Sequence, residues 1–168
     1  MFARKIHYAS VVLLATLGVL PLSASAWYIR LDVTVPKAHL LDEGNALGQV
    51  RDAIGDYDLH DLIEFAPFGA PYLTLVFPHA DWANKAGNYA TDFHAPSVLS
   101  DSWAFEVRTD APNRTVTLNW SSDNNNKLKQ SQLIDNTTGQ TIAVKPKKHY
   151  TFTMTGQTTR SFTWKVTP

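Results

Sequence analysis

Two histidines and two aspartates stand at the ends of one loop-like stretch: His79, Asp81, Asp92 and His94. Imidazole nitrogens and carboxylate oxygens can bind zinc, and an imidazole beside a carboxylate can act as a general acid–base pair. Their spacing matches no diagnostic pattern, and no HExxH signature occurs. Ordinary surface and turn positions therefore account better for these four residues than a zinc or catalytic site.

A second acidic group consists of Asp52, Asp56, Asp58 and Asp61, in a segment without clear strand periodicity. Calcium takes six to eight oxygen ligands, which a loop with several carboxylates can supply, although the EF-hand spacing is absent. The alternative is that these are turn residues that bond their own backbone. A structural calcium ion that orders this loop is therefore one prediction, and ordinary Asp turns are the other.

Trp82 and Tyr89 lie close together in the loop-rich stretch 78–101. An exposed loop tryptophan can stack on a sugar ring or anchor a protein interface, so these two residues are the predicted binding residues. The alternative is that Trp82 closes one end of the hydrophobic core. Three other tryptophans fall in alternating stretches and are predicted to pack in the core: Trp103, Trp120 and Trp164.

Motifs for nucleophilic catalysis and phosphate binding are absent from the chain. It has no cysteine, no GxSxG string and no glycine-rich phosphate loop, and no carboxylate pair stands out for glycoside hydrolysis. These features favour a protein that is not an enzyme.

Alternation of apolar and polar residues with a period of two is the dominant pattern, and it predicts β-strands. It runs through residues 27–35, 103–107, 116–120, 150–154 and 162–166, and shorter strands are predicted at 72–77, 89–94, 130–135 and 141–144. A short helix is expected at 46–54, a polar turn at 121–126 and a final hairpin turn at 156–159. Many short strands with frequent turns predict an all-β fold, a two-sheet antiparallel sandwich that is Ig-like or jelly-roll-like.

Residues 1–26 have the three parts of a secretory signal peptide. Arg4 and Lys5 precede an apolar run of about 14 residues, which is shorter than the roughly 20 that a spanning helix needs. Ala24 and Ala26 provide a small-residue cleavage site. We therefore expect cleavage after Ala26, a single domain over 27–168, no membrane span after cleavage, and a secreted or periplasmic location.

The charge balance excludes some classes of partner. Without Arg4 and Lys5 the chain has 13 Lys and Arg against 15 Asp and Glu, a net charge near −2. Nucleic acid and anionic lipid both require a basic surface, so neither is expected as a partner. The expected partner is instead a protein or polysaccharide of the cell envelope or exterior.

Spaced residues along most of the expected mature chain resemble a group of bacterial secreted modules. The resemblance rests on Asp42–Gly48, Asp56, Asp58, Asp61, Phe77–Trp82, Tyr89, Asp92, Trp103–Val107, Val116–Trp120, Leu133–Asp135, Tyr150, Phe152, Arg160 and Phe162. Modules of this group are Ig-like β-sandwiches at the C-termini of large extracellular proteins such as proteases. The resemblance implies no activity of its own and an accessory or binding role.

Together these observations predict an exported, non-catalytic protein that mediates binding or assembly through loops or an open sheet edge. Two alternatives remain. A carbohydrate-binding module would use exposed loop aromatics, and a structural subunit of a surface layer or filament would associate with itself.

Overall fold

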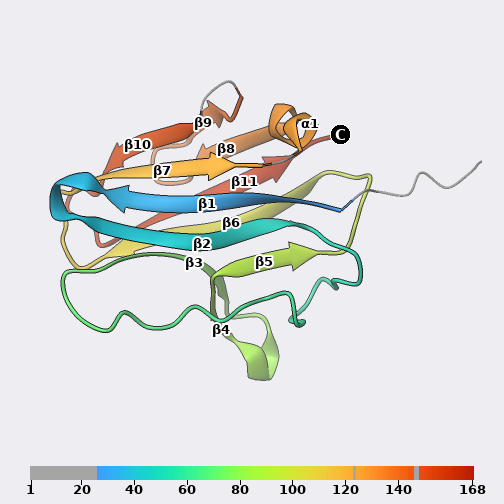
Figure 1. The fold of residues 1–168 in the computed structure, drawn as a ribbon, viewed down its shortest axis with the longest axis horizontal. Coiled ribbons are helices and arrows are strands. Elements are labelled where there is room, and N and C mark those ends of the chain that lie inside the picture. Colours follow the sequence, from blue (N-terminus) through green and yellow to red (C-terminus); the bar gives the residue numbers. More distant parts are fainter. Residues whose placement is uncertain (1–25, 123, 146–147) are drawn as a thin grey trace, which may run out of the picture.

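The chain folds into two packed β-sheets, which confirms the all-β, two-sheet prediction (Figure 1). The computed structural model describes residues 26–122, 124–145 and 148–168, so the predicted signal peptide lies outside the described residues apart from Ala26. Among the described residues, no helix has the length and apolar character needed to cross a membrane.

The strands are arranged as one sheet of five and one of six. The first has the order β10 (His149–Thr153), β7 (Thr115–Ser121), β1 (Trp27–Val35), β2 (Leu40–Gln49) and β5 (Thr91–His94). The second has the order β4 (Gly87–Tyr89), β3 (Leu73–His79), β6 (Asp101–Thr109), β11 (Thr159–Val166), β8 (Ser131–Asp135) and β9 (Gln140–Ala143). Neighbouring strands are antiparallel except for β2 and β5, which run parallel. Three short helices complete the described elements: η1 (Pro36–Ala38), η2 (Ala83–Lys85) and α1 (Asn125–Lys129).

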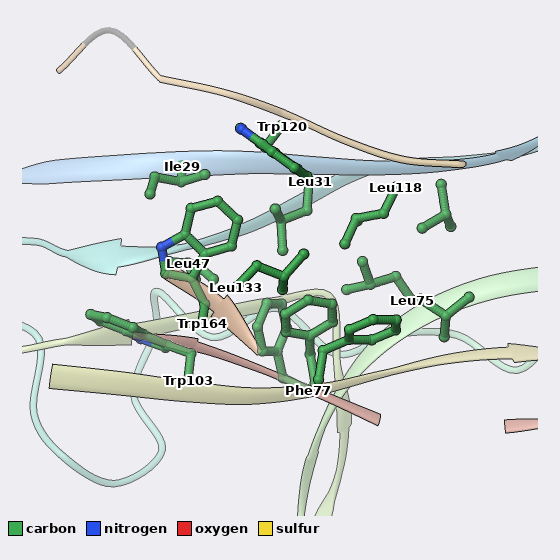
Figure 2. Close-up of a cluster of buried hydrophobic side chains, with 14 of the residues drawn as sticks. Ile29, Leu31, Leu47, Leu75, Phe77, Trp103, Leu118, Trp120, Leu133 and Trp164 are labelled. Atoms are coloured by element: carbon green, nitrogen blue, oxygen red, sulfur yellow. The ribbon is translucent and has the colours of Figure 1, made fainter. Parts of the chain in front are cut away.

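The hydrophobic core lies between the sheets and is built from the alternating residues. Figure 2 shows Leu31 and Leu118 entering the core from the five-stranded sheet, and Phe77 and Trp103 entering it from the six-stranded sheet. The predicted core positions of three tryptophans are confirmed, because Trp103, Trp120 and Trp164 are 0, 4 and 0% exposed. Large aromatic rings contribute much of the buried apolar area, so a core of this kind can hold the sandwich without disulfides.

A buried ion pair joins β8 to β11. The Asp135 carboxylate is fully buried and accepts hydrogen bonds from Arg160 Nε at 3.0 Å and from the Tyr150 hydroxyl at 3.0 Å. Burial would raise the pKa of Asp135, but the charge and hydrogen bonds of Arg160, together with the hydrogen bonds from Tyr150 and the Thr137 N–H, hold it below its usual range. Removal of either partner would leave an uncompensated charge inside the protein.

Two sequence predictions about secondary structure are wrong. No helix forms over residues 46–54, because β2 continues to Gln49 and its Leu47 enters the core opposite Ile29. The predicted polar turn at 121–126 instead contains the start of α1, where the Asn124 side chain accepts from the backbone N–H of Asn126. Asparagine is a favoured N-cap residue, which explains the helix start.

Two predictions about strand connection are also wrong. The segment 89–94 is not one strand, since β4 and β5 belong to different sheets. The turn at 156–159 does not close a hairpin, because β10 and β11 also lie in different sheets. This stretch therefore carries the chain across the sandwich.

Candidate binding surface

The apolar segment, residues 54–68, carries most of the large hydrophobic side chains that face solvent. It lies in the long irregular connection between β2 and β3, which runs along one side of the sandwich (Figure 1). Six of its side chains are more than half exposed: Ile54, Leu59, Leu62, Ile63, Phe65 and Phe68. Phe65 is 76% exposed and Phe68 is fully exposed. Exposed apolar side chains gathered in one segment mark an interaction surface more than scattered ones do.

Hydrogen bonds from backbone N–H groups to aspartate carboxylates fix the backbone of the first part of this segment. Asp58 accepts from the backbone N–H of Ile54 and of His60, both at 2.7 Å. Asp61 is buried, and its two carboxylate oxygens accept from the N–H of Asp58 at 2.9 Å and of Phe93 at 3.0 Å. The segment is therefore held by polar contacts, and its apolar side chains are left facing outward.

The second part of the segment extends the six-stranded sheet beyond β4. Ile63 forms an antiparallel bridge with Tyr89, flanked by hydrogen bonds from Ala90 N to Leu62 O at 2.7 Å and from Glu64 N to Asn88 O at 2.9 Å. In an antiparallel ladder of this pattern, the N–H and C=O of the central residue point to the other side. The outer backbone groups of Ile63 therefore form an open edge of the sheet.

The predicted aromatic binding residues are not an exposed platform. Trp82 is 6% exposed and Tyr89 is 2% exposed. The ring of Trp82 stacks on His79, with centroids 3.5 Å apart, and meets Tyr89 edge to face at 4.8 Å. Tyr57 packs against Trp82 at 6.1 Å and so anchors the apolar segment to this cluster. Trp82 belongs to the hydrophobic core, as the alternative in which it closes one end of the core expects, and neither ring is exposed as sugar stacking would require. Binding by Trp82 and Tyr89 stays a prediction.

A cluster of histidines and aspartates lies behind the apolar segment. The Asp92 side chain is 2% exposed, and its two oxygens lie 3.3 Å from His79 Nε2 and 3.3 Å from His94 Nε2. His94 Nδ1 lies 2.9 Å from Asp101, whose other oxygen accepts from Gln49 at 2.9 Å. The structure thus brings together His79, Asp92 and His94, which the sequence suggested as ordinary turn positions. Asp101 and Gln49 also belong to this cluster. Asp81 is 80% exposed, at 3.6 Å from His79.

The cluster is electrostatically coupled, because both ring nitrogens of His94 face carboxylates. Burial alone would lower the pKa of His94, but Asp101 and Asp92 raise it to about 10. Burial would likewise raise the pKa of Asp92, but His79 and His94 lower it. Asp92 Oδ1 and His79 Nε2 have no hydrogen-bond partner of good geometry, so Asp92 and the protonated His94 interact mainly through their charges at 3.3 Å. The cluster is connected to the apolar segment through Phe93, whose N–H donates to Asp61, and through His79, whose ring stacks on Trp82.

The four predicted calcium ligands do not converge. No group of three or more His, Asp or Glu residues within 26–122, 124–145 and 148–168 is arranged to hold a metal ion. Asp58 and Asp61 accept backbone hydrogen bonds, Asp56 accepts from Tyr57 N at 2.8 Å, and Asp52 is exposed. These contacts support the interpretation of the aspartates as turn residues, while calcium binding stays a prediction for chelation experiments.

The sequence predicted a segment without clear strand periodicity around Asp52–Asp61, but its outward apolar residues were missed. The signal that could have revealed them is a mixture of acidic and large apolar residues with neither helical nor strand periodicity, since such a segment has no single face to bury. Comparison of the chain with protein-family models, with curated proteins and with solved structures finds no match. The resemblance to bacterial Ig-like modules accordingly stays an expectation.

Proposed function

We propose that this chain is an exported, non-catalytic protein that binds another protein through the apolar segment. The exposure of Phe65 and Phe68 carries the proposal. A phenylalanine side chain has about 200 Å² of surface, so these two rings alone expose roughly 350 Å². The area of these two rings falls within the range of about 300–600 Å² that is typical of the largest apolar patch on a monomer, which is often functional. The other four exposed apolar side chains of the segment increase this area further.

Preorganisation of the backbone supports binding as the role of this segment. Hydrogen bonds to Asp58, Asp61 and Thr91 hold residues 54–62 in place before any partner arrives. A contact surface that is already ordered loses less conformational entropy on association, which favours affinity. The outer edge at Ile63 adds backbone groups that an extended partner strand could pair with.

The test compares two variants of the protein, expressed from the full sequence and purified from the exported fraction. The first replaces the two rings, Phe65→Ser with Phe68→Ser. The control is Leu41→Ser, which removes a leucine that is 56% exposed on β2. Surface substitutions of this kind change stability by about 0.5 kcal/mol or less, so both variants should fold.

Immobilised protein is incubated with solubilised cell-envelope and culture-supernatant material, and retained protein and sugar are analysed. We expect one protein to be retained by wild type and by Leu41→Ser and lost with the double variant. Retention of polysaccharide alone, or equal retention by all three proteins, would contradict the proposal. Turnover of ester, peptide or glycoside substrates that a single His or Asp substitution abolishes would also overturn it.

A further inference from the structure

Charge is distributed unevenly over the chain, and the apolar segment lies in its most acidic part. Residues 52–72 contain four Asp and one Glu, with no Lys or Arg. The described part of 124–168 carries five lysines, and its only acidic residue is Asp135, which is buried. A surface of either sign attracts the opposite one, so the two regions are complementary.

The acidic and basic regions lie at opposite edges of the six-stranded sheet. Residues 62–64 extend the sheet beyond β4 at one edge, and β9 forms the other edge (Figure 1). No described strand pairs with the outer side of β9. The basic edge is defined here as β9 together with Lys129, Lys145 and Lys148, all three of which are exposed.

Two hollows on the basic edge can receive side chains. One, of about 290 Å³, is lined by residues that include Lys129, Lys145, Ala143 and Val144. The other, of about 240 Å³, lies beside it and is lined by residues that include Leu128, Lys145 and Lys148. Each hollow therefore combines lysine side chains with apolar wall residues. This lining is complementary to the apolar segment, which combines acidic with apolar side chains.

We infer that the partner of the apolar segment is a second copy of this chain, bound through its basic edge. This inference rests on the proposed function and names the partner. Phe65 and Phe68 of one copy contact the hollows of the next. The acidic side chains of the segment that reach the surface pair with Lys129, Lys145 and Lys148, while the buried Asp61 takes no part. Desolvated aromatic anchors supply most of the affinity, and the charges set the orientation.

The contact joins two different surfaces, so each copy keeps one surface free. Such a heterologous contact can add copy after copy, unless the rotation between neighbouring copies closes the assembly into a ring. Two apolar segments facing each other would instead bring six acidic side chains together, Asp56, Asp58 and Glu64 of each copy, since Asp61 is buried, and like charges repel. The expected product is a head-to-tail chain of copies.

Two variants, each lacking one surface, test this arrangement. Phe65→Ser with Phe68→Ser removes the anchors, and Lys129→Glu with Lys145→Glu and Lys148→Glu reverses the basic edge. Lys37→Glu is the matched control, since Lys37 is an exposed lysine in η1, outside both surfaces. Light scattering after size exclusion and sedimentation velocity measure the mass of each protein alone and of equimolar mixtures.

We expect wild type and Lys37→Glu to form concentration-dependent oligomers, and each surface variant alone to associate about tenfold or more weakly. An equimolar mixture of the two surface variants should form a complex of one copy of each and nothing larger, because only one pair of intact surfaces remains. Wild type that stays monomeric, or a lysine variant that still dimerises alone, would overturn the inference. If wild type is monomeric yet its phenylalanine-dependent capture of another protein persists, the proposed function stands without self-assembly.

Discussion

The change in the free energy of unfolding between about pH 7 and pH 9 should come mainly from the deprotonation of His94. Its ring nitrogens lie 2.9 Å from Asp101 and 3.3 Å from Asp92. Burial opposes protonation, but the two carboxylates raise the pKa of His94 from 6.5 to about 10. Because the folded value exceeds the unfolded one, the stabilisation is complete below pH 6.5 and is lost as the pH rises through 10. At about 1.4 kcal/mol per pH unit, this linkage removes about 2.5 kcal/mol between about pH 7 and pH 9.

Urea unfolding of wild type and of His94→Gln at these two pH values measures the effect. The variant should be less stable at the lower pH, and its deficit should shrink by about 2.5 kcal/mol at the higher pH, because a glutamine side chain does not titrate. His149→Gln, at an exposed histidine of β10, is the matched control and should leave the pH dependence of wild type intact. A deficit of the same size at both pH values would show that His94 is uncharged in the folded protein and would refute the ion-pair description of the cluster.

Four further outcomes follow from the packing. Arg160→Met isolates the buried Asp135 carboxylate and should lower the free energy of unfolding in urea by about 3–5 kcal/mol. Trp82→Ala should cost about 3–5 kcal/mol in the same assay because the ring is buried, whereas an unchanged midpoint would mean that the ring is exposed. Gly48→Ala places a Cβ 2.3 Å from the Trp27 carbonyl oxygen, so its thermal midpoint should fall, and retention of the wild-type midpoint would contradict the β1–β2 approach. A chelator should leave the thermal midpoint unchanged if turn hydrogen bonds alone order the acidic loop, while a clear decrease would support bound calcium.

The strands and the core were predictable because alternation is a local property of the sequence. Trp103 and Phe105 alternate with small or polar neighbours, and both prove to be buried. The pairing of strands was not predictable in the same way. β10 and β11 read as a hairpin because a turn separates them, but their partners are β7 for the first and β6 and β8 for the second. Which sheet a strand joins depends on contacts far along the chain, and periodicity carries no information about those contacts.

The candidate site was predictable only in part. The sequence placed His79, Asp92 and His94 at the ends of one stretch. Asp92 and His94 lie two residues apart on β5, and their common contact forms because His79, at the end of β3 in the other sheet, reaches the same carboxylate. Asp101 could not be added from spacing, since its role depends on the start of β6 lying beside the end of β5. For Trp82, loop position suggested exposure, and only the packing of Tyr57 and His79 against its ring shows that it is buried.

The lysines beside β9 allow two explanations that predict opposite results. Edge strands often carry lysine because a charge at the edge prevents unwanted strand pairing. If protection were their whole role, glutamates at Lys129, Lys145 and Lys148 would protect equally well, and the charge-reversed protein would behave as wild type does. If the lysines receive the acidic, apolar segment of a second copy, the reversal replaces attraction with repulsion and association is lost. Raising the salt concentration to about 1 M shortens the screening length to about 3 Å, so it should weaken the wild-type contact and reduce the difference between the two proteins.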